Sequence, residues 1–290
     1  MCQITGKYMK GLLPYTINVG GKLMDLSEPQ VMGILNITPD SFYSESRKNT
    51  EEEIAGRVNA ILAEGGSIID VGAYSSRPGA DNISAEEEKD RLRGALQILR
   101  RTAPEAVVSV DTFRADVARM CVEEYGVQII NDISGGQLDP QMFETVAALG
   151  VPYVLMHMKG NPQTMQQEPH YDDLLTEMLQ YFGSKVQQLH ELGVKDIILD
   201  PGFGFAKTMD HNYELMNRLQ DLSVLELPLL VGVSRKSMIY KLLDSTPEGA
   251  LNGTSVLNTL ALLKGASILR VHDVKAAVEV VQIVKKMLAC

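Results

Sequence analysis

Residues 68–73 read IIDVGA, a short apolar run that is repeated in kind along the whole chain. Similar runs, rich in Val, Ile and Leu, are VMGILNI from Val31, VVSVDT from Val107, IINDI from Ile129, VPYVLMH from Val151, IILDP from Ile197, PLLVGVS from Pro228 and ILRVHD from Ile268. Their apolar residues are continuous rather than alternating, which indicates strands covered on both faces, as in a parallel sheet.

Segments of helical character separate these runs, and some have recognisable starts. Thr50 with Glu53, and Ser84 with Glu87, have the spacing of a capping box, and Asp273 can cap the last helix. Eight strand-then-helix units in succession predict an α/β fold, a single closed (β/α)8 TIM barrel over residues 1–290. A doubly wound open sheet is the alternative, but the chain shows no obvious domain break.

Residues 1–28 precede the first long run as an N-terminal extension. Within it, YTINVGGKLMDL places Gly20 and Gly21 between two short alternating runs, a pattern typical of a β-hairpin. We expect this hairpin to lie at the bottom of the barrel and to plug it.

The composition narrows the classes of function. The 290 residues are 45% hydrophobic and 22% charged, which argues against disorder or a coiled coil. The net charge of −10 disfavours nucleic acid and anionic membranes as partners, but allows a small anionic substrate in a locally basic pocket. Cys2, Cys121 and Cys290 are far apart and read as free thiols. Without an apolar run near 18 residues or a signal peptide, we expect a cytoplasmic protein.

Unusual polar residues gather where the predicted strands end. Asn36, Asp111, Asn131, Asp200 and Arg270 each lie at or near the C-terminal end of a strand. In a TIM barrel that end carries the active site. For any one of these residues a structural role is about as good an explanation, but five strands that end this way favour a shared site.

The loops after the strands are also unusual. NITPDSF follows the first strand and SSRPGA the second, and DPGFGFAK after the sixth has two glycines that let backbone approach a ligand. GVSRKS after the seventh strand puts Ser234, Arg235, Lys236 and Ser237 at a helix start, where positive side chains favour an anion.

These motifs carry a family resemblance. NITPDSF, SSRPGA, SVDT, INDISGG, DPGFGFAK, GVSRKS and RVHDV, in this order, resemble the dihydropteroate synthases of folate biosynthesis, and the match runs from Val31 to His272. The resemblance implies a transferase that condenses 6-hydroxymethyl-7,8-dihydropterin pyrophosphate with p-aminobenzoate, giving 7,8-dihydropteroate and pyrophosphate. It also implies that pyrophosphate leaves first and that the aromatic amine then attacks a cationic pterin.

The resemblance assigns roles to individual residues. The pterin site comprises Asp111, Asn131, Met156, Asp200, Phe205 and Lys236. A pterin presents two adjacent donors beside a carbonyl, which suits the carboxylate of Asp200 and the ammonium of Lys236. The pyrophosphate site comprises Asn36, Arg77, Arg270 and His272, with Asn36 as a ligand of Mg²⁺. The residues placed in the chemistry are Asp111, Lys236, Arg270 and His272.

The p-aminobenzoate site implied by the resemblance comprises Phe42, Ser76, Pro78, Lys236 and Ser237. Sulfonamides are expected to inhibit at the same site, and a homodimer through the barrel helices is expected. Two departures stand out. The second loop has Ser76 where STRPG is common, and Tyr43 to Arg47 replace the usual glycine-rich stretch that follows NITPDSF.

Several polar residues have simpler interpretations. His157 and His170 lack the spacing of metal ligands, and His157 is expected to be a hydrogen-bonded residue at a strand end. Asp132 is expected to accept structural hydrogen bonds, and Arg235 has a neighbouring carboxylate as an alternative partner. Two rival functions stay open: a methyltetrahydrofolate:corrinoid methyltransferase, and a binding protein that has lost the transfer chemistry.

Overall fold

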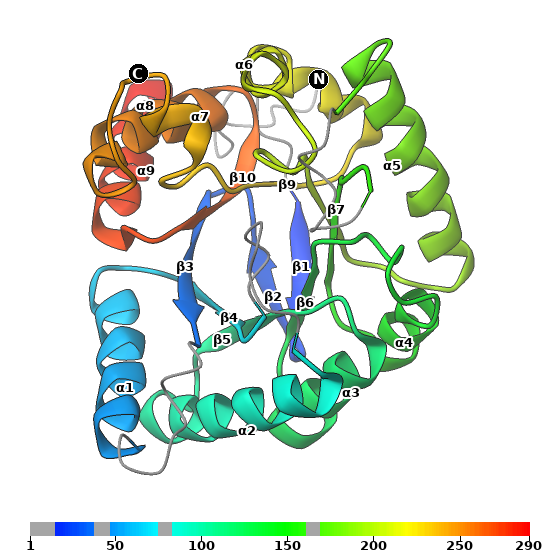
Figure 1. Ribbon diagram of the computed structural model, residues 1–290, viewed down its shortest axis with the longest axis vertical. Coiled ribbons are helices and arrows are strands. Elements are labelled where there is room, and N and C mark those ends of the chain that lie inside the picture. Colours follow the sequence, from blue (N-terminus) through cyan, green and yellow to red (C-terminus); the bar gives the residue numbers. More distant parts are fainter. Residues whose placement is uncertain (1–14, 38–46, 75–82, 161–168) are drawn as a thin grey trace, which may run out of the picture.

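The computed structural model describes residues 15–37, 47–74, 83–160 and 169–290. Within these ranges a closed barrel of parallel strands is ringed by helices (Figure 1). In barrel order the strands are β3 (Gln30–Asn36), β4 (Ile68–Gly72), β5 (Val107–Asp111), β6 (Ile129–Asp132), β7 (Tyr153–Met156), β8 (Ile197–Asp200), β9 (Leu229–Val231) and β10 (Ala266–Val271). Each predicted strand is confirmed, and closure between β10 and β3 rules out the open sheet.

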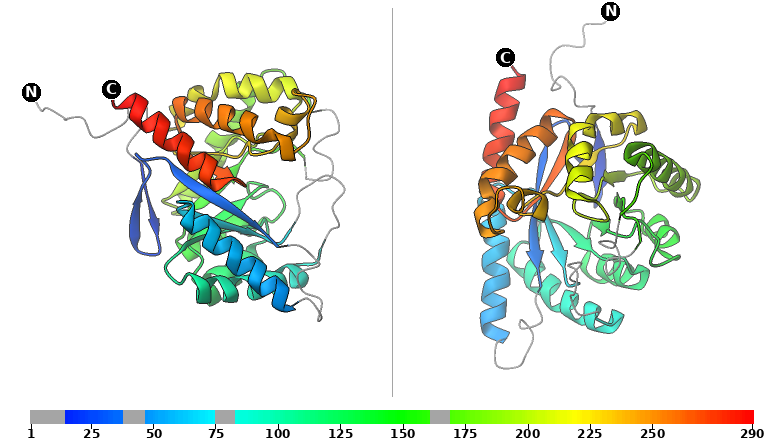
Figure 2. Two further views of the ribbon diagram at one scale, coloured as in Figure 1. Left: turned by 90° about the vertical axis from the view of Figure 1, so that its left-hand side faces the viewer. Right: turned by 45° about the horizontal axis from the view of Figure 1, so that its top comes forward.

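Helices alternate with the strands and cover the outside of the barrel (Figure 2). They are α1 (Arg47–Ala63), α2 (Ala85–Thr102), α3 (Ala115–Tyr125), α4 (Met142–Leu149), α5 (Leu174–Glu191), α6 (Met209–Asn217), η2 (Leu219–Leu225), α7 (Ser237–Tyr240), η3 (Glu248–Ala250), α8 (Leu251–Leu263) and α9 (Val274–Leu288). Each long helix turns an apolar face to the strands. In α2 that face is formed by Leu92, Leu96 and Leu99, all fully buried. Burial of one such side chain stabilises the folded state by about 1.5–3 kcal/mol relative to leaving it exposed.

The hairpin is confirmed at the bottom of the barrel. It consists of β1 (Thr16–Val19) and β2 (Lys22–Asp25), joined by Gly20 and Gly21 at φ values of 62° and 87°. The buried side chains of Ile17, Val19 and Leu26 pack in one cluster with residues at the starts of the barrel strands, such as Ile68 and Ile129. The hairpin therefore closes the end opposite the C-terminal ends of the strands.

Two of the three predicted helix starts are wrong in detail. The Ser84 hydroxyl accepts a hydrogen bond from the Glu87 N–H at 3.1 Å, as expected. However, α1 begins at Arg47, so Thr50 lies inside the helix rather than at its start. Asp273 precedes α9 but makes no capping bond, because Arg235 binds its carboxylate in bidentate fashion at 2.8 and 2.7 Å. A bidentate pair gives the carboxylate two charge-assisted hydrogen bonds, whereas a cap on one backbone N–H gives it one.

Candidate active site

The strand register aligns the predicted polar residues at the mouth of the barrel. Asn36 pairs with Gly72, Gly72 with Asp111, and Asp111 with Asn131, which makes one row across β3, β4, β5 and β6. On the far side of the mouth, Asp200 pairs with Met156. The structure therefore brings these strand-end residues together at the face where TIM barrels carry their chemistry.

Arg270 reaches this row from β10 and joins two carboxylates. Its Nε donates to Asp70 Oδ2 at 2.6 Å, and its Nη2 donates to Asp111 Oδ2 at 3.0 Å. The Asn131 amide also donates to Asp70 Oδ2, at 3.2 Å. Burial opposes the charge on Arg270, but Asp70 and Asp111 outweigh it and raise its pKa above the ordinary value. Burial raises the pKa of Asp111, and Arg270 opposes that shift.

Asp70 was not predicted as a site residue. It is fully buried in the middle of β4, and its Oδ1 has no hydrogen-bond partner among the described residues. The signal in the sequence was the lone carboxylate within IIDVGA, since a charge in a buried strand is costly without a partner. Asp70 fixes the direction of Arg270 and of Asn131 together.

Asp200 and Lys236 lie on the opposite part of the mouth and influence each other electrostatically. Asp200 is 7% exposed, its Oδ1 accepts from the Gly202 N–H at 2.7 Å, and its Oδ2 has no partner among the described residues. Burial raises the pKa of Asp200, and Lys236 opposes that shift. Burial lowers the pKa of Lys236 to about 8, with Asp200 opposing. The Lys236 ammonium donates to the Phe203 carbonyl and lies 4.8 Å from the centre of the Phe205 ring.

A buried lysine, Lys207, supports this part of the mouth and was also missed. Lys207 is 4% exposed and lies 3.1 Å from His157 Nδ1, while it donates to the carbonyls of Gly202 and Phe205 at 3.1 and 3.2 Å. Burial lowers the pKa of Lys207 to about 7. His157 is thus a hydrogen-bonded strand-end residue, as predicted. Lys207 ties it to the loop that carries Phe205, and buried Met156 packs in the same small cluster.

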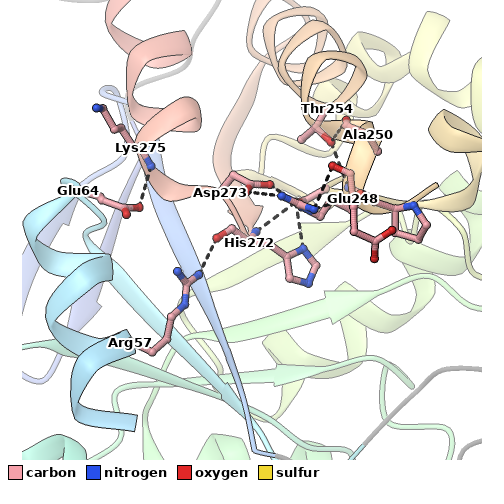
Figure 3. Close-up of polar contacts among 11 residues, drawn as sticks. Arg57, Glu64, Glu248, Ala250, Thr254, His272, Asp273 and Lys275 are labelled. Carbon is pink, nitrogen blue, oxygen red and sulfur yellow. Dashed lines mark hydrogen bonds and ion pairs between the residues drawn. The ribbon is translucent and has the colours of Figure 1, made fainter. Parts of the chain in front are cut away.

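Other simple interpretations are confirmed as well. Asp132 is fully buried and accepts from the Tyr153 hydroxyl and from the N–H groups of Ser134 and Gly136. Arg235 pairs with Asp273 and donates to the carbonyls of Pro247 and Glu248, contacts that Figure 3 shows in part.

The residues expected to bind p-aminobenzoate are only partly described. Phe42, Ser76 and Pro78, together with Arg77 of the pyrophosphate site, lie outside the described residues. Ser237 is the first residue of α7 and lines a pocket between α6 and α7. Gly204, Thr208 and Lys241 also line that pocket.

The expected Mg²⁺ ligand has suitable chemistry. Asn36 is exposed at the end of β3 and offers an amide oxygen, the ligand type that Mg²⁺ prefers. Among the described residues, no three His, Cys, Asp or Glu side chains form a metal-binding group. In the described part of the chain, no helix is long and apolar enough to cross a membrane.

The comparisons with known proteins agree with this site. A family model described as pterin binding enzyme matches residues 32–272. Dihydropteroate synthase of Escherichia coli K12 is 42% identical over 271 residues, 93% of this chain and 95% of that protein. The Yersinia pestis dihydropteroate synthase in complex with a sulfonamide drug has a TM-score of 0.87 and 40% identity, covering 95% of this chain and 100% of that one. The Xanthomonas albilineans enzyme with 4-aminobenzoic acid has a TM-score of 0.87 and 34% identity, over 96% and 100% of the two chains. The chain therefore belongs to the pterin-binding enzymes and, among them, to the dihydropteroate synthases.

Proposed function

We propose that the barrel mouth condenses 6-hydroxymethyl-7,8-dihydropterin pyrophosphate with p-aminobenzoate by letting pyrophosphate leave before the amine attacks. The observation that carries this proposal is the electrostatic interaction of a buried carboxylate, Asp200, with the half-buried ammonium of Lys236, beside a guanidinium already held by two carboxylates. The first pair complements a pterin ring, and the guanidinium of Arg270 complements a departing anion.

The pterin half of the substrate lies on the β6, β7 and β8 side in this proposal. Asp200 Oδ2 accepts from the adjacent amino and ring N–H groups, and Lys236 donates to the ring carbonyl. Asn131 adds a ring hydrogen bond, and Met156 and Phe205 line the ring. Asp111 supplies negative charge near the methylene carbon, which becomes positive as the C–O bond breaks.

The pyrophosphate lies on the β3 and β10 side. Arg270 and His272 bind its oxygens, and Arg77 contributes a further contact from the second loop. Asn36 is the protein ligand for Mg²⁺, which when bound supplies positive charge that stabilises the leaving pyrophosphate. The nucleophile is a neutral aromatic amine, so no strong general base is required.

The p-aminobenzoate lies between Lys236, Ser237 and the first two loops, which contribute Phe42, Ser76 and Pro78. Ser237 and the N–H groups at the start of α7 receive its carboxylate. The pocket beside Ser237, with Lys241 at its edge, supports this placement. Because p-aminobenzoate and the sulfonamide drugs both carry an aniline ring with a para group of oxygen acceptors, we propose that sulfonamides compete at this site.

The protein is also proposed to form a homodimer through α8 and α9, which pack side by side (Figure 1). On α8, Leu251, Val256, Leu260 and Leu263 are 39–52% exposed, and on α9 Ile283 is 68% exposed. Exposed large apolar side chains on two neighbouring helices are a feature of interfaces. Sedimentation velocity should give a dimer, and Val256→Lys should give a monomer with the barrel still folded. The cytoplasmic location stays a prediction.

The test is to follow pyrophosphate release and dihydropteroate formation with the dihydropterin pyrophosphate and Mg²⁺, with and without p-aminobenzoate. We expect dihydropteroate only when p-aminobenzoate is present, and a sulfonamide should inhibit its formation. A protein that binds the pterin tightly but forms no dihydropteroate would contradict the proposal. The binding protein left open by the sequence would then be the better description. Transfer of a methyl group from methyltetrahydrofolate would instead favour the corrinoid methyltransferase.

A further inference from the structure

Among the described residues, the side chain of His272 makes its hydrogen bond with Ser234. The Ser234 hydroxyl oxygen lies 3.1 Å from His272 Nδ1, and it accepts a hydrogen bond from the backbone N–H of His272, also at 3.1 Å. Ser234 is 5% exposed and follows β9, the neighbour of β10 in the barrel. One hydroxyl group therefore contacts both the backbone and the ring of the same histidine.

These two contacts determine where the ring proton lies. A serine hydroxyl has a single hydrogen, and its oxygen already accepts the His272 N–H. A protonated Nδ1 could donate to the second lone pair of that oxygen, but the hydrogen of this buried hydroxyl would then have no acceptor in the described part of the chain. Because a buried donor without an acceptor is costly, the hydroxyl hydrogen points to Nδ1. Nδ1 then accepts, and the proton of the neutral ring is on Nε2. Burial and then Arg270 lower the pKa of His272 to about 4, so the ring is neutral at neutral pH.

Arg57 of α1 holds the backbone of the same residue. Its Nη2 donates to the His272 carbonyl at 2.6 Å (Figure 3). Its Nε donates to the Ile34 carbonyl at 3.2 Å. The paired residues of β3 and β10 end with Gly33 and Val271, so Ile34 and His272 would form the next pair. The guanidinium therefore bridges the two strands where their own pairing stops.

We propose that Ser234 and Arg57 are positioning residues that present His272 to the leaving pyrophosphate as a neutral Nε2–H hydrogen-bond donor. This inference rests on the proposed contact between His272 and the pyrophosphate. A donor fixed in one tautomer binds an anion without reorganisation, whereas a ring that exchanges tautomers offers the anion an unprotonated Nε2 part of the time. Ser234 sets the tautomer, and Arg57 sets the position of the residue.

The first experiment needs no substrate and so tests the inference apart from the proposed function. Long-range ¹H–¹⁵N correlation spectra of the ¹⁵N-histidine-labelled protein at pH 7.5 report the tautomer of each ring, and His272→Gln identifies the signal among the five histidines. We expect an unprotonated Nδ1 and a protonated Nε2. A protonated Nδ1 in the wild-type protein would overturn the inference, whether or not the protein makes dihydropteroate.

The second experiment compares variants at Ser234. Ser234→Ala should mix the two tautomers. Because only the Nε2-protonated fraction then binds, an equal mixture should weaken binding of Mg²⁺-pyrophosphate about two-fold. Binding of hydroxymethyl-dihydropterin, which lacks the pyrophosphate, should be unchanged, and Ser234→Thr should restore both the tautomer and the affinity. Equal weakening of both ligands, or a wild-type tautomer in Ser234→Ala, contradicts the inference.

Arg57 is tested on the same readout. Arg57→Met removes both bridging hydrogen bonds and should weaken Mg²⁺-pyrophosphate several-fold, again without an effect on the pterin alone. The matched control is Asn59→Met, at an exposed position on the same helix, which should behave as wild type. If Arg57→Met and Asn59→Met bind pyrophosphate equally well, Arg57 does not position His272.

Discussion

The two sides of the barrel mouth handle buried charge differently. On the β4, β5 and β10 side, the guanidinium of Arg270 is paired in advance with Asp70 and Asp111. On the β8 and β9 side, Lys236 is half-buried and Lys207 is buried, and burial lowers the pKa values of these two ammonium groups to about 8 and about 7. One side stays charged at any physiological pH, whereas the other is close to losing its charge.

The contrast follows from the chemistry of the two cations. A guanidinium does not deprotonate in proteins, and its planar fork binds two carboxylates at fixed angles. An ammonium group is a point charge whose pKa falls readily on burial. The guanidinium side suits a polyanion that must always meet positive charge. The ammonium side suits a neutral ring that needs one donor and one acceptor.

The largest expected effect is on the guanidinium side. Asp70→Asn removes one of the two carboxylates that bind Arg270. Because breaking a buried ion pair is strongly destabilising, the free energy of unfolding should fall by about 3 kcal/mol. Urea denaturation of the ligand-free protein measures this free energy of unfolding. The matched control is Glu105→Gln, which breaks the exposed Lys22–Glu105 pair and should cost under about 0.5 kcal/mol. If the two variants lose a similar free energy of unfolding, the buried Asp70–Arg270 ion pair contributes no more to stability than an exposed one.

The second effect is on the ammonium side. In Asp200→Asn an amide cannot accept from both ring donors or keep the negative charge, so pterin affinity should fall roughly 100-fold. Isothermal titration with hydroxymethyl-dihydropterin measures it. Asp172→Asn, at a side chain that is 96% exposed, is the control and should bind as wild type. Unchanged pterin binding in Asp200→Asn rules out this assignment of the ring site.

The third prediction concerns pH. Pterin affinity should fall as the pH rises through about 8, where Lys236 loses its proton. Lys236→Arg should bind more weakly at pH 7 but should show no fall up to pH ~9.5, because the guanidinium keeps its charge. Isothermal titrations with hydroxymethyl-dihydropterin at a series of pH values measure both affinities. If the affinity of Lys236→Arg falls in parallel with that of the wild type, a group other than Lys236 causes the pH dependence.

The stability of the free protein should change in the opposite direction. Both lysines have folded pKa values below the ordinary 10.5, so the unfolded chain binds more protons in the window from about 7 to 10.5. The contribution of the two lysines to the free energy of unfolding therefore rises with pH across that window. Urea denaturation at several pH values measures this rise. The share of the rise that Lys207 contributes should be absent in Lys207→Met.

The smallest expected effect is at Gly72, in the row between Asn36 and Asp111. A Cβ at Gly72 would lie 3.5 Å from Asp111 Cβ and 3.7 Å from Asn36 Oδ1, both ordinary contacts, so Gly72→Ala should fold. The added methyl group crowds the proposed ion ligand, and binding of Mg²⁺-pyrophosphate should fall a few-fold while pterin binding stays unchanged. Gly56→Ala on α1, where a Cβ meets nothing within 4 Å, is the control. A loss of pterin binding in Gly72→Ala would show that the two sides of the mouth are not independent.

The barrel and much of the site could be predicted because their signals are local. Each strand is a continuous apolar run, and residues such as Asp200 and Asn131 stand out at the end of such a run. The order of strands and helices then places all of these ends on one face. The hairpin was equally local, since Gly20 and Gly21 define its turn.

Only the tertiary structure decided which charges meet. Asp70 pairs with Arg270, which is 200 positions away, and Arg57 reaches the carbonyl of His272 across 215 positions. Asp273 could have capped α9, but it lies beside Arg235 and binds it instead. A sequence states which side chains carry charge and which segments are apolar. The partner of a buried charge is chosen when the barrel closes, because closure brings the first and last strands together and removes water as the alternative partner.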